Sequence, residues 1–310
     1  MPANPMISEN WVRFLLPIAR KEWDQSMRLV PSPFAPLMGG GNSTSPVEYS
    51  QGVGGFGLVP EYNSSDAEGD PAVIQYDSFN PLFEATFTHK EYALGVSIER
   101  KLWDDNQSGL IRRKASALGM SFGTTRAVHA SSMLNNAFST SHVGADEVAL
   151  CSASHPVSPT DTTVVSNAGG TALSYAAIVN TLIAGASMQD DRGAPMPIIY
   201  DVLYVPIALQ SKAFELIQAI GKPGTADNDA NFLASRGLRV VVDPYLTSAK
   251  SWFMIDSMQS KLHALWFDRV RPELTMDPAS DFNLVAKYRG YMRYSFGWDD
   301  FRFIFGHNVA

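Results

Sequence analysis

Apolar and polar residues alternate along two neighbouring stretches in the first third of the chain, at 83–88 and 92–99. A period of two is typical of a strand with one buried face, so we expect a strand in each stretch. Weaker strand patterns at 47–50 and 73–76 flank a polar tip, which predicts a long two-stranded hairpin. Such a hairpin is marginal by itself and needs another surface to lie on.

A helical period follows. Between Ile111 and Met133, apolar residues recur every three or four positions without a proline. The pattern predicts a helix over 105–136, which at 1.5 Å per residue spans about 45 Å. Three glycines weaken its helix propensity but permit close backbone contact with a neighbour. They are Gly109, Gly119 and Gly123.

The two ends of the chain have different patterns. Prolines at positions 2, 5 and 17 predict only short helical pieces within 8–27, and a Pro/Gly-rich linker follows at 31–46. From residue 173 onward, helical and strand patterns alternate, and a strand pattern covers 284–296. The expected elements between them are a helix at 173–188, strands at 198–205, 238–242, 252–255 and 262–266, and a helix from 206 to 220. The chain is therefore predicted to be α+β, without an internal repeat.

Composition narrows the class of protein. The 310 residues are 45% hydrophobic and 18% charged, which excludes a disordered polymer and predicts two domains or one elaborated domain. The single cysteine excludes an intrachain disulfide and fits a reduced, intracellular setting. No window approaches the roughly 18 apolar residues of a membrane span, so no membrane partner is expected.

Charge is concentrated in one segment. The chain has 24 basic and 31 acidic residues, which argues against a sequence-reading nucleic-acid binder. Between Leu29 and His89 there is no Lys or Arg, and this stretch contains seven acids, enough to account for the whole net charge of −7. They are Glu48, Glu61, Asp66, Glu68, Asp70, Asp77 and Glu84.

Catalytic, metal and cofactor motifs are weak. The glycines of 52–57 are not followed by the helix that a phosphate-binding loop requires, and the histidines have no metal-site spacing. Cys151 and His155 lie four residues apart, but a Cys–His nucleophile also needs an orienting Asn or Asp and an oxyanion site. We therefore expect no enzyme, metal or cofactor, and keep a Cys/His enzyme as an alternative.

A series of short motifs carries a resemblance. In chain order they are Ser97-Ile-Glu-Arg100 with Asp104-Asp105, Leu134-Asn-Asn-Ala137, His155-Pro156 before Leu173-Ser174, Asp190-Asp-Arg-Gly193, Val205-Pro206 with Leu209, Val240–Tyr245-Leu246, Trp252 and Lys287-Tyr-Arg-Gly290. Each is weak alone, but with the preceding arm and acidic hairpin their order resembles the Hong Kong 97-type major capsid proteins of tailed phages. More narrowly, the chain resembles the phage Mu-like major head subunit family.

The resemblance implies the α+β Hong Kong 97-type fold. Its expected parts are an N-terminal arm at 1–45, an E-loop at 46–90, a P-domain over 91–172 that contains the long spine helix, an A-domain at 173–266, P-domain strands at 267–298 and a C-terminal strand at 299–310 in the A-domain. The implied function is structural: hexamers and pentamers that assemble in the host cytoplasm into an icosahedral virion shell around double-stranded DNA. DNA contacts would not be sequence-specific.

The family also implies other partners, namely a portal, a separate scaffolding protein and in some members a decoration protein. Some members join their subunits by an isopeptide bond from an E-loop lysine. Because no lysine lies between Lys21 and Lys90, we expect non-covalent overlap of E-loops and arms instead. An encapsulin-like compartment, which shares the fold and encloses protein cargo, is the alternative function.

Subunit contacts are expected where the arm and the hairpin meet a neighbour. We expect acidic hairpin residues to face basic residues, and arm aromatics to be buried in the interface, because buried aromatics dominate interface energies. The alternative is that these aromatics pack on their own subunit. The candidates are Trp11, Phe14, Arg20, Lys21, Trp23, Glu48, Glu61, Asp66, Glu68, Asp70, Arg100, Lys101, Arg112, Arg113 and Lys114.

Overall fold

The computed structural model describes residues 11–55, 59, 76, 78, 81–105, 108–219, 221, 230–276 and 285–309. The chain divides into two compact units. The first unit contains Met1–Glu48, Phe87–Asn135 and Ala264–Gly297, and the second contains Tyr49–Thr86, Asn136–His263 and Trp298–Ala310.

A four-stranded sheet forms the base of the first unit, in the order β1-β11-β12-β4. Its strands are β1 (Gly39–Asn42), β11 (Ala264–Met276), β12 (Val285–Trp298) and β4 (Lys90–Glu99). β1 runs parallel to β11, whereas β12 and β4 are antiparallel over ten paired residues. β4 confirms the strand expected at 92–99, and β12 confirms the alternating pattern near the C-terminus.

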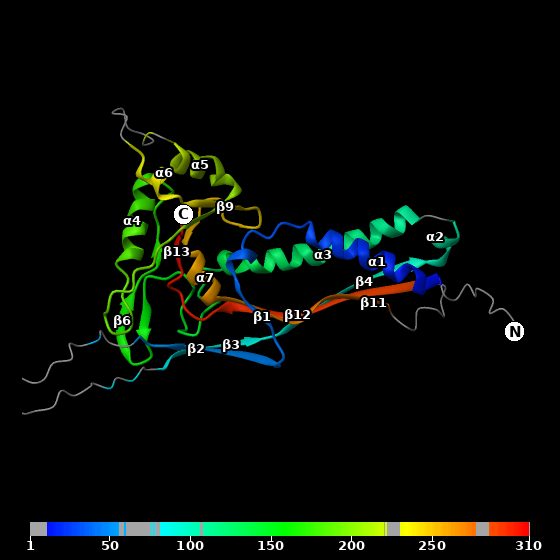
Figure 1. Ribbon diagram of the computed structural model, residues 1–310, viewed down its shortest axis with the longest axis horizontal. Helices are drawn as coiled ribbons and strands as arrows, with labels where there is room; N and C mark the ends of the chain where they lie inside the picture. Colours follow the sequence, from blue (N-terminus) through cyan, green and yellow to red (C-terminus); the bar gives the residue numbers. More distant parts are fainter. Residues whose placement is uncertain are drawn as a thin grey trace, which may run out of the picture. The chain divides into compact units, whose positions relative to one another are not determined.

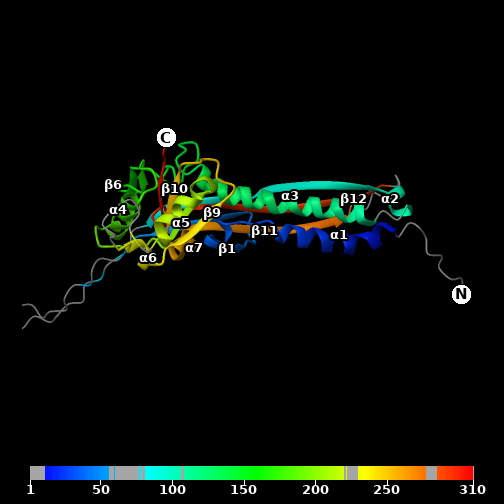
Figure 2. The same ribbon diagram turned by 90° about the horizontal axis from the view of Figure 1, so that it is seen from above.

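Two helices lie side by side in this unit, α1 (Trp11–Arg28) and α3 (Ser108–Asn135), after the short α2 (Arg100–Asp104) (Figures 1 and 2). α3 confirms the long helix predicted from the apolar period. Its apolar face packs into one buried cluster with α1 and the sheet, which includes Ile98, Phe122 and Tyr288. Gly119 and Gly123 of α3 approach the α1 backbone so closely that a Cβ would lie 2.2 Å from the Trp23 carbonyl oxygen and 2.7 Å from that of Met27.

The N-terminal helix corrects the expectation of short helical pieces. α1 is 18 residues long and continues through Pro17. An interior proline removes one helical hydrogen bond and costs about 3 kcal/mol. Burial of Ala19 and Trp23 against α3 offsets this cost, since the burial of large apolar side chains contributes a comparable amount.

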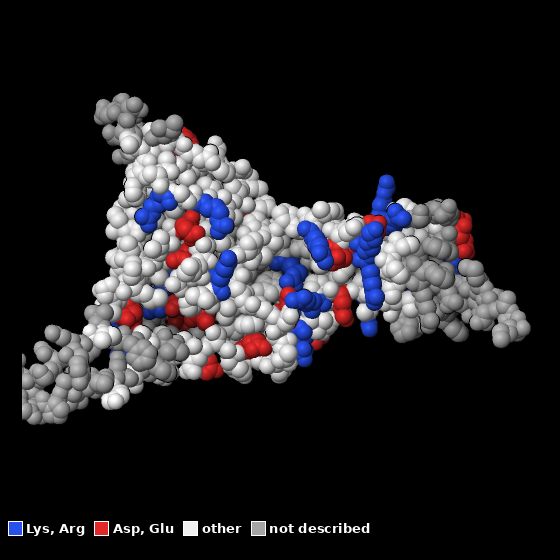
Figure 3. Space-filling model, viewed as in Figure 1, with Lys and Arg blue, Asp and Glu red and all other residues white. Residues whose placement is uncertain are grey.

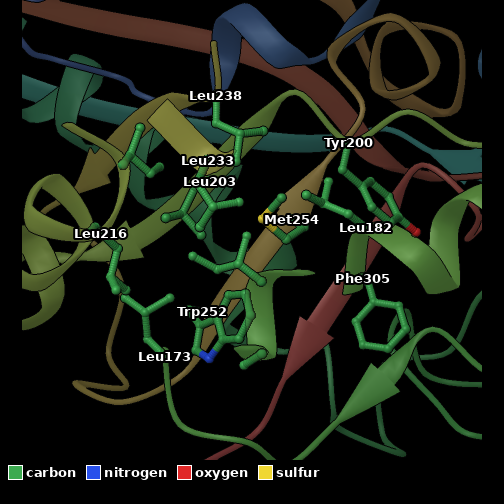
Figure 4. Packing of buried hydrophobic residues seen from close by; sticks show 14 of the residues in the cluster. Leu173, Leu182, Tyr200, Leu203, Leu216, Leu233, Leu238, Trp252, Met254 and Phe305 are labelled. Carbon is green, nitrogen blue, oxygen red and sulfur yellow. The ribbon is translucent and has the colours of Figure 1, made fainter. Parts of the chain in front are cut away.

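The second unit is built on a mixed five-stranded sheet in the order β7-β13-β10-β8-β9. Its strands are β7 (Ala168–Gly169), β13 (Ile304–His307), β10 (Trp252–Ile255), β8 (Val202–Pro206) and β9 (Arg239–Asp243). Around it lie α4 (Tyr175–Ala186), α5 (Gln210–Gln218), α6 (Phe232–Arg236), α7 (Ser257–His263) and the 3-10 turn η3 (Ile207–Leu209). Another 3-10 turn, η2 (Ala35–Leu37), belongs to the first unit. Leucines from α4, α5 and α6 meet Trp252, Met254 and Phe305 of the sheet in one core (Figure 4).

Most elements expected after residue 173 are confirmed, including the strand at 252–255 and the helix within 173–188. The region before them differs from the expectation. Residues 139–172 have loop composition and are expected in the P-domain with the spine helix, yet they contain the hairpin β5 (His155–Ser158) and β6 (Asp161–Val165) and lie in the second unit. Asn167 explains this placement, because its amide donates hydrogen bonds to the carbonyls of Leu150, Phe301 and Ile304.

The predicted long hairpin has a shifted second strand. β2 (Val47–Val53) pairs with β3 (Pro81–Thr88), so the alternating 83–88 stretch is the partner of the first strand. The strand expected at 73–76 lies outside the described residues, except for Tyr76.

Candidate functional site

Polar contacts within the second unit hold the base of the β2–β3 hairpin. The Ser50 hydroxyl on β2 donates to Asp299 Oδ2 at 2.6 Å, and the Gly55 amide donates to Asp191 Oδ1 at 2.9 Å. The Arg192 guanidinium donates to the Ser78 carbonyl. The two ends of the hairpin segment are therefore fixed to their own subunit.

A small cavity of about 170 Å³ adjoins this base, between both hairpin strands and His263. His263 Nδ1 donates to Asp299 Oδ1 at 2.9 Å. Burial alone lowers the pKa of His263, but the hydrogen bond to Asp299 and the charge of Asp300 outweigh it, and the pKa is raised. The same carboxylate that holds β2 thus also favours a charged histidine.

Behind this cavity lies a buried polar cluster that includes His155. Its Nδ1 donates to Asp146, and its ring stacks on Phe301 at 3.7 Å. Burial raises the pKa of the Cys151 thiol, whereas a nucleophilic cysteine requires a lowered one. The geometry assigns His155 and Cys151 to the core of the second unit and gives no support to a Cys/His catalytic site.

The aromatic candidates of the N-terminal arm differ in their surroundings. The Trp23 side chain is 4% exposed and makes an edge-to-face contact with Phe122 at 5.7 Å. It therefore packs on its own subunit, which was the alternative for these aromatics. Trp11 and Phe14 belong to α1, but their side chains lie outside the described residues.

The basic candidates all lie in the first unit, on α1, α2 and α3. Arg20, Lys21, Lys101 and Arg113 are exposed, and the Arg20 Nε donates to the Leu274 carbonyl at 2.9 Å. The others have partners within the subunit: Arg100 pairs with Asp104, Arg112 with Glu22, and Lys114 with the Ser97 carbonyl. Figure 3 shows that Lys and Arg gather on the face over α1 and β11, mixed with fewer acids.

The acidic candidates divide into one described residue and four that lie outside the described residues. Glu48 accepts a hydrogen bond from Ser43, whose hydroxyl also contacts His89 Nε2 at 3.0 Å. Glu48 is thus engaged at the start of β2. The residues that lie outside are Glu61, Asp66, Glu68 and Asp70.

Sequence reasoning missed a groove of about 470 Å³ beside β1 in the first unit. The glycine run of β1 read as a linker because glycine has low strand propensity. The only signal of this strand in the sequence is the glycine run itself. At Gly40 glycine is required, because φ is +104° and an added Cβ would lie 2.1 Å from the Trp266 carbonyl oxygen. A glycine run adjoining a strand therefore marked a close backbone approach.

Among the described residues, no helix is long and apolar enough to cross a membrane.

Several solved structures from phages are similar to this protein. The protein is similar to a chain in the procapsid of bacteriophage JBD30 (TM-score 0.53, 14% identity, 96% of this chain and 75% of that one). It is also similar to a chain of the cyanophage Pam1 capsid asymmetric unit (0.55, 12%, 91% and 93%) and to one of Mycobacterium phage Adephagia (0.53, 13%, 90% of both). These likenesses establish the Hong Kong 97-type fold.

No curated protein sequence matches the chain. The family model described as "Phage capsid protein" matches residues 84–306, which include the spine helix, three of the four strands of the first sheet and almost all of the second sheet. The chain belongs to the phage capsid protein family, and its function is that of a structural major capsid protein.

Proposed function

We propose that this capsid protein assembles as hexamers and pentamers into a closed icosahedral shell around double-stranded DNA, held by non-covalent overlap of hairpins and N-terminal arms. Within the family, the order of its short motifs supports a place in the Mu-like head subunit group. The proposal includes a portal, a separate scaffolding protein and assembly in the host cytoplasm.

The proposed domain assignment follows the two units. The first unit corresponds to the P-domain with the arm helix α1, the second unit to the A-domain, and the β2–β3 hairpin to the base of the E-loop. Residues 136–172 join the A-domain side in this assignment, because β7 pairs with β13 of the five-stranded sheet. The C-terminal strand is part of the same sheet.

One observation carries the proposal of overlap. The segment between β2 and β3 leaves apolar side chains exposed in the single subunit: Val59 is 95% and Tyr76 is 93% exposed. Apolar side chains of this size gain about 1.5–3 kcal/mol from full burial. A second copy of the chain is the natural source of that burial in a shell, where many weak contacts add to a durable assembly.

Charge contacts contribute less to cohesion. Exposed ion pairs are worth about 0–1 kcal/mol each, so acidic hairpin residues against basic residues such as Arg113 and Lys101 set register and salt sensitivity. Contacts of this kind weaken as salt screens them, whereas apolar burial does not.

Negative-stain electron microscopy of the purified protein, alone and with its scaffolding protein, tests the proposal. Uniform closed particles whose DNA resists nuclease support it. Particles that contain protein cargo and no nucleic acid support the encapsulin-like alternative. Subunits that never close under either condition contradict both.

A further inference from the structure

His89 is the single residue between β3 and β4, and its side chain lies in a buried hydrogen-bonded network of the first unit. Its Nε2 lies 3.0 Å from the hydroxyl of Ser43, the residue after β1, and its Nδ1 lies 3.0 Å from the hydroxyl of Ser295 on β12. The Ser43 hydroxyl donates in turn to Glu48 on β2. The network therefore connects both ends of the hairpin segment to β12 and to the end of β1.

The donors and acceptors of this network determine which nitrogen of a neutral His89 carries the proton. The Ser43 hydroxyl also contacts the Glu48 carboxylate and the Ser45 carbonyl, which only accept hydrogen bonds, so its proton is directed at them. The Ser43 oxygen then accepts from His89, which places the imidazole proton on Nε2. Nδ1 is left without a proton and accepts from the Ser295 hydroxyl. Neutral His89 thus gives every proton of the network an acceptor.

A charged His89 does not fit the same arrangement. Its second proton is on Nδ1, which then has to donate to the Ser295 oxygen, and the Ser295 hydroxyl loses the ring as its acceptor. The two serines and the histidine are all buried, at 5–6% exposed, so water does not readily replace the lost contact. A buried hydroxyl without a partner is unfavourable, and protonation of His89 therefore strains its link to β12.

The charges around the ring act in the same direction. Three charged groups face His89 from other strands: Glu48 of β2, Arg269 of β11 and Arg293 of β12. Burial, followed by the charge of Arg293, lowers the pKa of His89, and the opposing Glu48 charge and Ser45 backbone contact do not compensate. A lowered histidine pKa means that the network contributes stability above the unfolded pKa of about 6.5 and loses it as pH falls through the folded value.

We propose that His89 is an acid-sensitive latch, whose protonation loosens both ends of the β2–β3 hairpin where they join the sheet of the first unit. The latch is a property of one subunit, because every member of the network belongs to the same chain and the same unit. Near neutral pH the latch is closed, and mild acid opens it.

A second histidine at the base of the hairpin responds in the opposite sense. His263 donates to Asp299, whose other oxygen accepts from Ser50 of β2. Burial and the nearby Arg302 disfavour a charged His263, but the hydrogen bond to Asp299 and the charge of Asp300 outweigh them, and its pKa is raised. Acid therefore keeps His263 charged and this contact in place, so the loosening is confined to the network of His89.

Amide hydrogen exchange of the dissociated, full-length subunit at pH 7.5 and pH 5 tests the proposal, with rates corrected for the intrinsic effect of pH. Because the unfolded pKa is about 6.5, a latch that excludes the charged ring opens up to about thirtyfold more readily at pH 5. We expect the protection of residues 43–48 and 86–90 to fall by at least threefold, and that of residues 257–263 to change less than twofold. An equal fall in all three segments, or no fall at 43–48 and 86–90, overturns the proposal.

His89→Gln removes the titrating group and keeps one donor and one acceptor in its place. The acid response of residues 43–48 and 86–90 should then shrink to less than twofold. His129→Gln is the matched control, because His129 is also a histidine of the first unit whose pKa is lowered by burial and by Lys90, but it lies on α3 and contacts the Tyr294 hydroxyl at 2.6 Å. It should leave the wild-type response intact. A response that survives His89→Gln, or that disappears in His129→Gln, contradicts the latch.

Nitrogen-15 NMR of the histidine-labelled wild-type subunit provides a measurement that does not depend on the folding of a variant. The two ring nitrogens of His89 should report a proton on Nε2 and none on Nδ1 at pH 7.5. The second proton should appear over the same pH range in which residues 43–48 and 86–90 lose protection. A proton on Nδ1 at pH 7.5, or protonation without loss of protection, overturns the proposal.

Discussion

Replacing Gly119 with Ala tests whether the contact between α1 and α3 depends on a missing side chain. Gly119 lies inside α3 opposite Trp23 of α1, and an added Cβ would lie 2.2 Å from the Trp23 carbonyl oxygen. That oxygen is backbone in a regular helix, so it cannot rotate away as a flexible side chain would. The two helices must separate by about an ångström or more to restore an ordinary carbon–oxygen contact.

Two opposing terms determine the size of the effect. Gly→Ala in a helix interior favours the helix by about 1 kcal/mol. Forcing an extra methyl group into a close-packed contact costs about 1–3 kcal/mol, and separating the helices also exposes part of Trp23. The two terms leave a net loss of up to about 2 kcal/mol, so we expect Gly119→Ala to lower the free energy of unfolding despite the better helix propensity of alanine, with the loss concentrated in α1.

Gly109→Ala is the matched control, because Gly109 is in the same helix and nothing lies within 4 Å of its added Cβ. This change should raise the free energy of unfolding by up to about 1 kcal/mol. Urea unfolding of the dissociated subunit gives both values, and amide hydrogen exchange by mass spectrometry should show faster exchange in α1 only for Gly119→Ala. Equal stabilisation by both substitutions, with α1 exchange unchanged, would refute the reasoning.

Three further predictions concern other side chains. Arg126→Lys should lower the free energy of unfolding by about 1–2 kcal/mol, because lysine cannot reproduce the two-bond contact with Asp268; an unchanged urea midpoint contradicts this. The pKa of His263 is raised in the folded state, so its protonation stabilises the fold below the unfolded pKa of about 6.5, and this contribution is lost as pH rises through the folded pKa. His263→Gln should therefore flatten the fall in urea midpoint between pH 6 and 8, and identical slopes in both proteins count against this prediction. Burial lowers the pKa of His307 to about 4, so the free energy of unfolding should fall as pH drops from about 6.5 toward 4. His307→Gln should remove this part of the acid dependence. An equal dependence on pH in both proteins would show that another group causes it.

The spacing of apolar residues along the chain predicted those helices and strands whose apolar faces are buried in the folded subunit. The spine helix and the strand at 92–99 have apolar residues at the period of their own structure, and Ile98 of that strand packs in the same cluster as the helix. The strand at 252–255 is a continuous apolar run and is buried throughout. The prediction that glycines in the long helix permit close contact is confirmed at Gly119 and Gly123. In these cases the sequence pattern and the final fold depend on the same side chains.

Elements that depend on distant partners could not be predicted. Pro17 ends a helix on local grounds, yet α1 continues because α3 provides a surface for it. The 139–172 segment has loop composition, and its contacts with the C-terminal residues, through the Asn167 side chain and the pairing of β7 with β13, hold it in the second unit. A single sequence shows neither partner, since both lie more than 90 residues away along the chain.

For the candidate contact residues too, the sequence indicated residue type but not the partners that distant parts of the chain provide. Charge counting found the acidic segment and exposed cations such as Arg113, but it gave no weight to what a residue already contacts. Trp23 read as an interface anchor and is buried in its subunit, whereas the glycine run of β1 read as a linker and is an open strand edge. Trp23 is thus a core residue and the glycine run of β1 is an outermost strand, which differs from both expectations.

The burial of Trp23 has a physical reason in a protein that must fold first and assemble later. A tryptophan needed for folding has to be buried in the subunit, because an exposed one would favour association before the fold is complete. The main-chain groups at the open edge of β1, by contrast, can be hydrogen-bonded by water while the subunit is alone, so leaving them exposed does not prevent folding.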